Sequence, residues 1–166
     1  MHPFRHGYLK ESSSSTTHWN KEDVTFLSSL KTCAKKKDIH QINRIYSDIV
    51  KKGVHGTLPY LCTSIICCYS RCGLLEDAQN VLKKLHHRDV VSWTALITGY
   101  VQEGRDYEAL ECFQQMQDEG VHPNAVTFLS VLSACCHSGL LDESQILFGN
   151  MHEKYGITPN FEHHNC

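Results

Sequence analysis

Apolar residues follow one another along this chain at steps of four and three, which is the spacing of one face of an α-helix. The spacing occurs twice in each of four consecutive segments, residues 23–58, 59–89, 90–124 and 125–160. In the first half of each segment, positions 4, 8 and 11 are Phe26, Leu30 and Cys33; Cys62, Ile66 and Tyr69; Trp93, Ile97 and Tyr100; Phe128, Leu132 and Cys135. In the second half, positions 20, 24 and 27 are Ile42, Tyr46 and Ile49; Ala78, Leu82 and Leu85; Ala109, Phe113 and Met116; Ser144, Phe148 and Met151. Each segment is therefore predicted to form two amphipathic helices.

A turn is predicted between the two helices of each segment. Position 15 is Gly73, Gly104 or Gly139 in the last three segments, and glycine suits a helix C-terminus because it tolerates a left-handed backbone. The first segment has Lys37 there, so it lacks this signal. One helix pair cannot bury both of its apolar faces alone, whereas consecutive pairs can stack on one another. The sequence thus predicts an all-α fold, an α-solenoid of helix-turn-helix repeats.

The letters within the segments resemble one repeat family. Residues 90–124 read VVSWTALITGYVQEGRDYEALECFQQMQDEGVHPN and resemble the ordinary unit of the plant pentatricopeptide repeat (PPR) family. Residues 63–89 read TSIICCYSRCGLLEDAQNVLKKLHHRD and resemble the short unit of the PLS subclass, which alternates long, short and ordinary repeats. Residues 126–166 resemble the last long unit before that subclass's E/DYW extension domains, and residues 161–166 match the start of a further repeat. A tetratricopeptide scaffold fits the period but not these letters.

The resemblance implies a right-handed superhelix that binds single-stranded RNA, with one base contacted by each unit. In the family, position 5 and the last residue of a unit contact the base edge, while position 2 packs on the base face. These positions are Thr63, Asp89 and Tyr60 in the short unit, and Thr94, Asn124 and Val91 in the ordinary unit. By resemblance, threonine with aspartate favours guanine and threonine with asparagine favours adenine. The two middle units are thus expected to read guanine and then adenine, from 5′ to 3′.

The two long units, residues 23–58 and 125–160, predict no base. Their position 5 is Leu27 or Leu129, and leucine cannot form a hydrogen bond with a base edge. Val24 and Val126 at position 2 either pack against a base or are buried at the start of a helix.

A structural alternative also stands for the four polar positions of the middle units. Ser, Thr, Asp and Asn cap helices and form turns in any helical protein. Helix capping therefore accounts for Thr63, Thr94, Asp89 and Asn124 without any ligand.

Charge is divided unevenly along the chain. The formal net charge is −2, but residues 1–88 carry 14 Lys and Arg against 7 Asp and Glu, whereas residues 89–166 carry 2 against 11. Lysines cluster at 35–37 and 51–52, where they either meet phosphates or form a solvated helix end. Because phosphate contacts supply most nonspecific affinity, the acidic second half predicts weak, salt-sensitive RNA binding.

Metal, disulfide, cofactor and membrane interpretations find no support in the residues. The nine cysteines include no CxxC pair, and most of them fall within the helical pattern, as expected of small buried side chains. No metal site and no cofactor are therefore expected. No stretch of 18 apolar residues is present, so no membrane-spanning helix and no membrane partner are expected.

Catalysis is not expected of this chain. Cytidine-deaminase-like domains need an HxE motif followed by PCxxC, and neither motif occurs here. The resemblance implies a contribution to organellar RNA modification (C-to-U editing) or to RNA processing, with a deaminase or an editing accessory protein supplied in trans. It also suggests an array truncated before the extension domains.

The remaining expectations concern the first 22 residues and the alternatives to RNA binding. Residues 1–22 are expected to be a disordered or transit-like leader, and the family favours a mitochondrial location, with the chloroplast as the alternative. A helical-repeat scaffold that binds proteins, or a nonfunctional fragment, are the competing functions.

Overall fold

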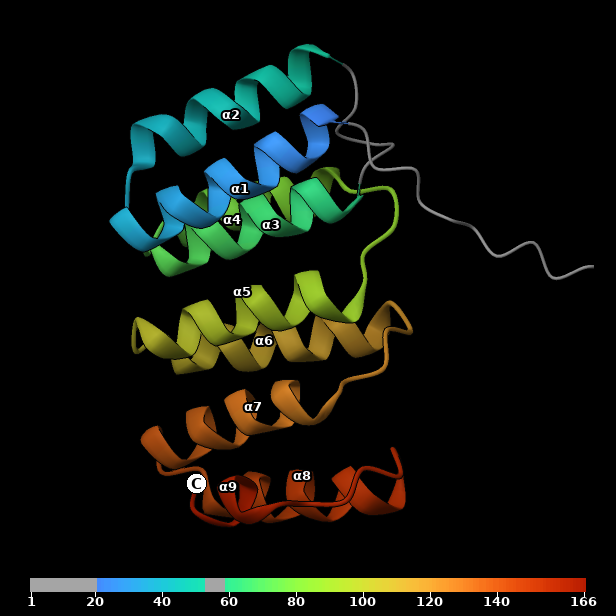
Figure 1. Cartoon of the computed structure of the whole chain (residues 1–166). Coiled ribbons are helices and arrows are strands. Elements are labelled where there is room, and N and C mark those ends of the chain that lie inside the picture. The colour runs from blue at the N-terminus through green and yellow to red at the C-terminus, as the bar shows by residue number, and fades with distance from the viewer. Residues whose placement is uncertain (1–20, 53–58) are drawn as a thin grey trace, which may run out of the picture.

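The structure is a computed structural model that describes residues 21–52 and 59–166 of the chain (Figure 1). The described residues form helices and no strand, which confirms the predicted all-α solenoid. The helices are α1 (Lys21–Lys36), α2 (Ile39–Lys51), α3 (Pro59–Arg71), α4 (Leu75–Lys84), α5 (Val90–Gln102), α6 (Asp106–Asp118), α7 (Ala125–His137), α8 (Leu141–Glu153) and the short α9 (Phe161–His164). Residues 1–20 of the predicted 1–22 leader lie outside the described residues, and Lys21 and Glu22 are the first residues of α1.

Two rows of helices make up the stack (Figure 1). The first row consists of α1, α3, α5 and α7, each packed on the next, and α9 packs on α7. The second row consists of α2, α4, α6 and α8; each packs on its own first-row partner, and α2, α4 and α6 also contact the first-row helix of the following unit. One apolar core therefore runs through the stack between successive helix pairs.

The core consists mainly of the side chains predicted from the helical spacing. Position 8 of the segments is at most 1% exposed at Leu30, Ile66, Ile97 and Leu132. Phe26, Ser144 and Phe148 are only partly buried, although the corresponding residues of the middle segments are buried. These three residues lie in the first and last helix pairs, where the described chain supplies a neighbouring unit on one side only.

Lys37 forms the same turn as the glycines at its position. Its φ of 52° is left-handed, close to the 74°, 70° and 69° of Gly73, Gly104 and Gly139. The Asp38 amide donates to the Cys33 carbonyl at 3.1 Å, which is the six-residue bond that closes a Schellman turn. The first hairpin thus closes without a glycine, at the cost of a left-handed lysine.

The nine cysteines are free thiols, and Cys33, Cys62, Cys68, Cys112 and Cys135 are buried. Within residues 21–52 and 59–166, no group of three or more His, Cys, Asp and Glu side chains is arranged to hold a metal ion. No helix in the part of the chain that the structure describes is long and apolar enough to cross a membrane.

Candidate nucleic-acid interface

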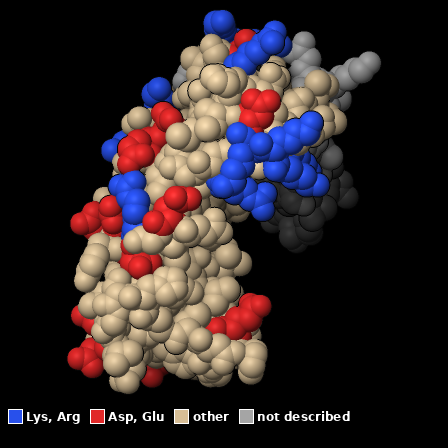
Figure 2. Space-filling model, turned by 90° about the vertical axis from the view of Figure 1, so that its left-hand side faces the viewer, with Lys and Arg blue, Asp and Glu red and all other residues tan. Residues whose placement is uncertain are grey.

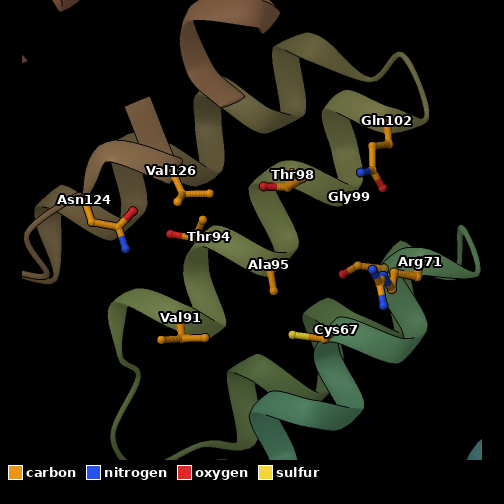
Figure 3. A pocket seen from close by; sticks show the side chains of 11 residues that line it. Cys67, Arg71, Val91, Thr94, Ala95, Thr98, Gly99, Gln102, Asn124 and Val126 are labelled. Atoms are coloured by element: carbon orange, nitrogen blue, oxygen red, sulfur yellow. The ribbon is translucent and has the colours of Figure 1, made fainter. Parts of the chain in front are cut away.

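A pocket of about 440 Å³ opens on the first-row helices, between α3, α5 and the start of α7 (Figure 3). Four of the residues predicted to contact RNA line it, namely Val91, Thr94, Asn124 and Val126. The other lining residues are Cys67, Ser70, Arg71, Ala95, Thr98, Gly99 and Gln102. The structure therefore brings together the positions assigned to the ordinary unit and position 2 of the unit that follows it.

The valines at position 2 are exposed rather than buried. Val91 is 52% exposed and Val126 is 57% exposed, and Figure 3 shows them on opposite sides of Thr94. Val24 of the first unit is 54% exposed, so burial at a helix start is wrong for Val24 and Val126. Tyr60 differs, because it is only partly exposed and packs against the core. Two exposed aliphatic faces with a hydroxyl between them are suited to a flat ring that carries a polar edge.

Thr94 and Asn124 belong to one hydrogen-bond network, which passes through Thr127. The Thr94 and Thr127 hydroxyl oxygens are 2.6 Å apart. Asn124 is the N-cap of α7: its Oδ1 accepts from the Thr127 amide at 3.0 Å and from the Thr127 hydroxyl at 3.0 Å. The Asn124 amide in turn donates to Thr127 Oγ1 at 3.1 Å. The two residues assigned to the base edge are thus joined by a buried third residue.

Asp89 is the N-cap of α5. Its carboxylate accepts from the Ser92 amide at 2.8 Å, and its own amide donates to Ser92 Oγ at 3.1 Å. Helix capping is therefore confirmed for Asp89 and Asn124. Each cap uses one side-chain oxygen as the acceptor. The second carboxylate oxygen of Asp89 and the Nδ2 of Asn124 therefore take no part in capping.

Thr63 and Asp89 do not line the 440 Å³ pocket. Thr63 is 8% exposed, similar to Thr94 at 7%. Asp89 lies near enough to the Cys67 thiol to raise its pKa, although burial is the larger cause of the increase and Arg71 opposes it. Leu27 and Leu129 are partly buried, and their side chains offer no hydrogen-bonding group.

The charged and polar residues at the rim of the pocket were not predicted from the sequence. Arg71 ends α3 and Gln102 ends α5, and both line the pocket. They share position 13 of their units with Lys35 and His137. A polar or cationic residue at the end of every first-row helix was the available signal, since the apolar spacing alone does not require it.

Charge divides the surface in the same way as the sequence. Figure 2 shows Lys and Arg side chains over the end of the stack built by the first units, whereas Asp and Glu are the charged residues towards the other end. Arg71 is the last Lys or Arg on a first-row helix in chain order. Of the later ones, Lys83 and Lys84 end α4, and Arg88, Arg105 and Lys154 lie between helices. The pocket therefore lies where the basic half of the stack meets the acidic half.

Family models of the PPR repeat match most of the described chain. The model described as the PPR repeat family matches residues 88–137. The model described as the PPR repeat matches residues 60–90 and 126–155. Together these matches span residues 60–155, which is more than half of the chain.

Curated relatives extend the match to nearly the whole chain. The pentatricopeptide repeat-containing protein CRR2, chloroplastic, of Arabidopsis thaliana is 38% identical over 158 residues, or 95% of this chain and 24% of CRR2. A second Arabidopsis thaliana pentatricopeptide repeat-containing protein, named as mitochondrial, is 34% identical over 87% of this chain and 31% of its own length. The chain spans about a quarter of the length of CRR2.

Solved structures show the same fold. The pentatricopeptide repeat protein PPR10 from maize superposes with a TM-score of 0.71 and 22% identity, over 89% of this chain and 21% of PPR10. PPR10 in complex with an 18-nucleotide psaJ RNA element superposes with a TM-score of 0.68 and 24% identity, over 86% of this chain and 21% of that one. With the repeat models, the relatives and the helical stack in agreement, this chain belongs to the PPR repeat family.

Proposed function

We propose that the chain binds single-stranded RNA in the pocket between α3, α5 and α7, and that it contributes to RNA modification or processing in an organelle without catalysing it. The observation that carries the proposal is the convergence of Val91, Val126, Thr94 and Asn124 on one open pocket. A base that enters the pocket would lie between the two valines, with its polar edge towards Thr94 and Asn124. A protein-binding scaffold does not need this combination of exposed aliphatic side chains and buried, ordered polar groups.

In this proposal the ordinary unit, with Thr94 and Asn124, takes adenine. The short unit, with Thr63 and Asp89, takes the guanine on its 5′ side, because the free carboxylate oxygen of Asp89 can accept from the N–H groups of guanine. Val24, which is as exposed as Val91, would contact the base of the first unit in the same manner, and the partly exposed Tyr60 would contact the base of the second. PPR10, whose structure is known with an RNA element, supports RNA as the ligand class.

The expected affinity is low. Base-edge pairs discriminate by roughly 1–3 kcal/mol each, and two such pairs cannot single out one transcript. The acidic second half of the stack supplies few phosphate contacts, so binding should weaken steeply as salt rises. Relatives named as chloroplastic and as mitochondrial support an organellar location. A role in C-to-U editing would need a deaminase or an accessory protein in trans.

Selection from a randomised single-stranded RNA pool at two salt concentrations tests the proposal. We expect enrichment of guanine followed by adenine at the lower salt, and loss of that enrichment in the double variant Thr63→Ala plus Thr94→Ala. Ser144→Ala on α8 serves as the control and should keep the enrichment. Circular dichroism establishes that each variant is folded. No enriched dinucleotide, or enrichment that survives the double variant, would contradict base reading.

A further inference from the structure

The network around Thr127 has a definite order of protons, which follows from a single backbone group. The Thr127 amide can only donate, and it points at the Asn124 side chain at 3.0 Å. The atom that faces it must therefore be the acceptor Oδ1, because a flipped amide would place Nδ2 protons against the Thr127 N–H. Asn124 Nδ2 is consequently turned away from α7.

The orientation of Asn124 fixes the proton of Thr127. Asn124 Oδ1 also lies 3.0 Å from the Thr127 hydroxyl, and Oδ1 has no proton to give, so Thr127 donates to it. Thr127 Oγ1 also accepts a hydrogen bond from the backbone N–H of Asn124 at 3.1 Å. A hydroxyl has one proton and two lone pairs, and Thr127 has now used its proton and one lone pair.

The remaining contact of Thr127 fixes the proton of Thr94. At 2.6 Å the two hydroxyl oxygens need a proton between them, and only Thr94 can provide it. Thr94 therefore faces the pocket with lone pairs only, and Asn124 faces it with Nδ2 protons only. Thr94 and Asn124 together therefore present one acceptor and one donor to the pocket in a fixed arrangement.

We infer that Thr127 is a positioning residue that sets the base preference of the ordinary unit, although it belongs to the next unit and is itself fully buried. This inference rests on the proposed function. Adenine has an amino donor at N6 beside the acceptor N1, which complements Thr94 as acceptor and Asn124 as donor. Guanine has the opposite order, with the acceptor O6 beside the N1 donor. The fixed protons thus admit the amino base and reject the keto base.

The corresponding box at Asp89 shows why Thr127 matters in particular. Ser92 occupies the same position of α5, but its hydroxyl donates to the Asp89 backbone carbonyl at 2.9 Å rather than to the side chain. A carboxylate needs no such orientation, because both of its oxygens accept. Proton order is therefore required where the last residue of a unit is an amide, and it is redundant where that residue is an acid.

Replacing Thr127 by valine tests the inference, because the shape of the side chain is nearly kept while its hydroxyl is lost. The probes are four ten-nucleotide uridine RNAs in which one guanine is followed by adenine, cytosine, guanine or uridine. We expect the parent chain to bind the adenine RNA at least about fivefold more tightly than the guanine RNA, as one base-edge pair allows. In Thr127→Val the ratio should fall below about twofold, because the Thr94 hydroxyl loses the acceptor that fixes its proton and can then donate to a base as well as accept from it, while the retained backbone N–H of residue 127 still orients Asn124.

Two controls accompany the valine variant. Thr127→Ser keeps the hydroxyl and should keep the parent ratio. Ser130→Ala removes a neighbouring hydroxyl pair between α5 and α7, in which Ser130 lies 2.8 Å from Thr98, but leaves Asn124 and Thr127 in place. It should therefore also keep the ratio. If Thr127→Val does not fold, Thr127→Cys is measured instead. Its adenine-to-guanine binding ratio should also fall below about twofold, because a thiol is only a weak hydrogen-bond donor.

The outcomes separate this inference from the proposed function. A Thr127→Val chain that binds RNA with the parent's adenine-to-guanine ratio overturns the inference and leaves RNA binding intact. A parent chain that binds none of the four RNAs overturns both. A ratio that collapses in Thr127→Val and persists in Thr127→Ser and Ser130→Ala supports the inference.

Discussion

The junction between α3 and α5 and the junction between α5 and α7 join equivalent helices, yet they are held together differently. At the first junction the backbones approach closely: a Cβ on Gly99 would lie 2.7 Å from the Cβ of Ser70 and 2.9 Å from Leu75 Cδ2. At the second junction hydroxyl pairs bridge the helices, with Thr94 to Thr127 at 2.6 Å. One repeat pattern therefore accommodates an apolar contact and a polar seam. Both junctions line the pocket, with Ser70 and Arg71 from the first and Asn124 from the second.

The largest expected effect comes from breaking the close approach at the first junction. In Gly99→Ala the new methyl group would overlap Ser70, whose Cβ is fixed to the backbone and cannot swing away. Overpacking costs about 1–3 kcal/mol, which exceeds the gain of about 1 kcal/mol in helix propensity. We expect the free energy of unfolding, measured by urea denaturation, to fall by as much as about 2 kcal/mol.

Gly149→Ala on α8 is the matched control for Gly99→Ala. Nothing lies within 4 Å of a Cβ built on Gly149, so only the propensity gain applies and the free energy of unfolding should rise. Equal stability of Gly99→Ala and the parent chain would show that the first junction is not tightly packed.

The next effect probes the polar seam of the second junction. Asn124→Ala and Asp89→Ala each remove a helix N-cap and should each lower the free energy of unfolding by about 1 kcal/mol. Thr94→Val should couple with the first variant, since Thr127 bonds both Thr94 and Asn124. With Asp89→Ala it should be additive. Double-mutant cycles measure the difference, and equal coupling in both cycles would contradict the network.

A smaller effect distinguishes the first hairpin from those that follow it. Lys37 has the left-handed φ of 52°, which costs an L-residue about 1 kcal/mol. Lys37→Gly should therefore raise the thermal midpoint slightly, since the greater freedom of glycine in the unfolded chain offsets part of the gain. Gly104→Ala is the reverse substitution at the same turn position and should lower the midpoint. A lower midpoint for Lys37→Gly would indicate that the lysine side chain makes compensating contacts.

The smallest effect concerns the ion pairs between successive units. Arg105, at the start of α6, bonds Glu76 of α4 at 2.6 Å, whereas His137 of α7 and Asp106 of α6 are 3.3 Å apart. The hydrogen bond with Arg105 holds the pKa of Glu76 below its usual 4.5. A lowered pKa stabilises the fold above the unfolded value, and this contribution is lost as pH falls through the folded value. In urea titrations between pH 5 and pH 3, Glu76→Gln should lose slightly less stability than the parent. An identical pH dependence in Glu76→Gln and the parent would mean that the Arg105–Glu76 pair does not contribute to stability.

Sequence periodicity predicted most of the fold, because the burial of residues such as Ile66 and Ile97 repeats at the spacing of a helix face. It could not predict the left-handed Lys37, since lysine carries no turn signal. It also could not predict Gly99, because a close approach of two helices depends on Ser70 and Leu75, which lie in another unit.

The candidate site was only partly readable from the sequence. Family positions located Val91, Thr94 and Asn124, which the structure places in one pocket. Thr127 escaped notice because it sits at neither an apolar position of the helix spacing nor a base-contacting position. Its role depends on three hydrogen bonds that cross the boundary between two units. The rim residue Arg71 was missed for a related reason, since a helix-end cation also fits a solvated surface.

The substitution Asn124→Asp measures the central claim most directly, because it retains the cap of α7 and the bonds with Thr127 while it exchanges the amide donor for an acceptor. Binding is measured to two short RNAs that carry guanine followed by either adenine or guanine. The account predicts that the parent chain prefers adenine and that Asn124→Asp prefers guanine, with the same fold by circular dichroism. An unchanged adenine preference in Asn124→Asp, or no preference in the parent, would contradict the claim that this pocket reads a base.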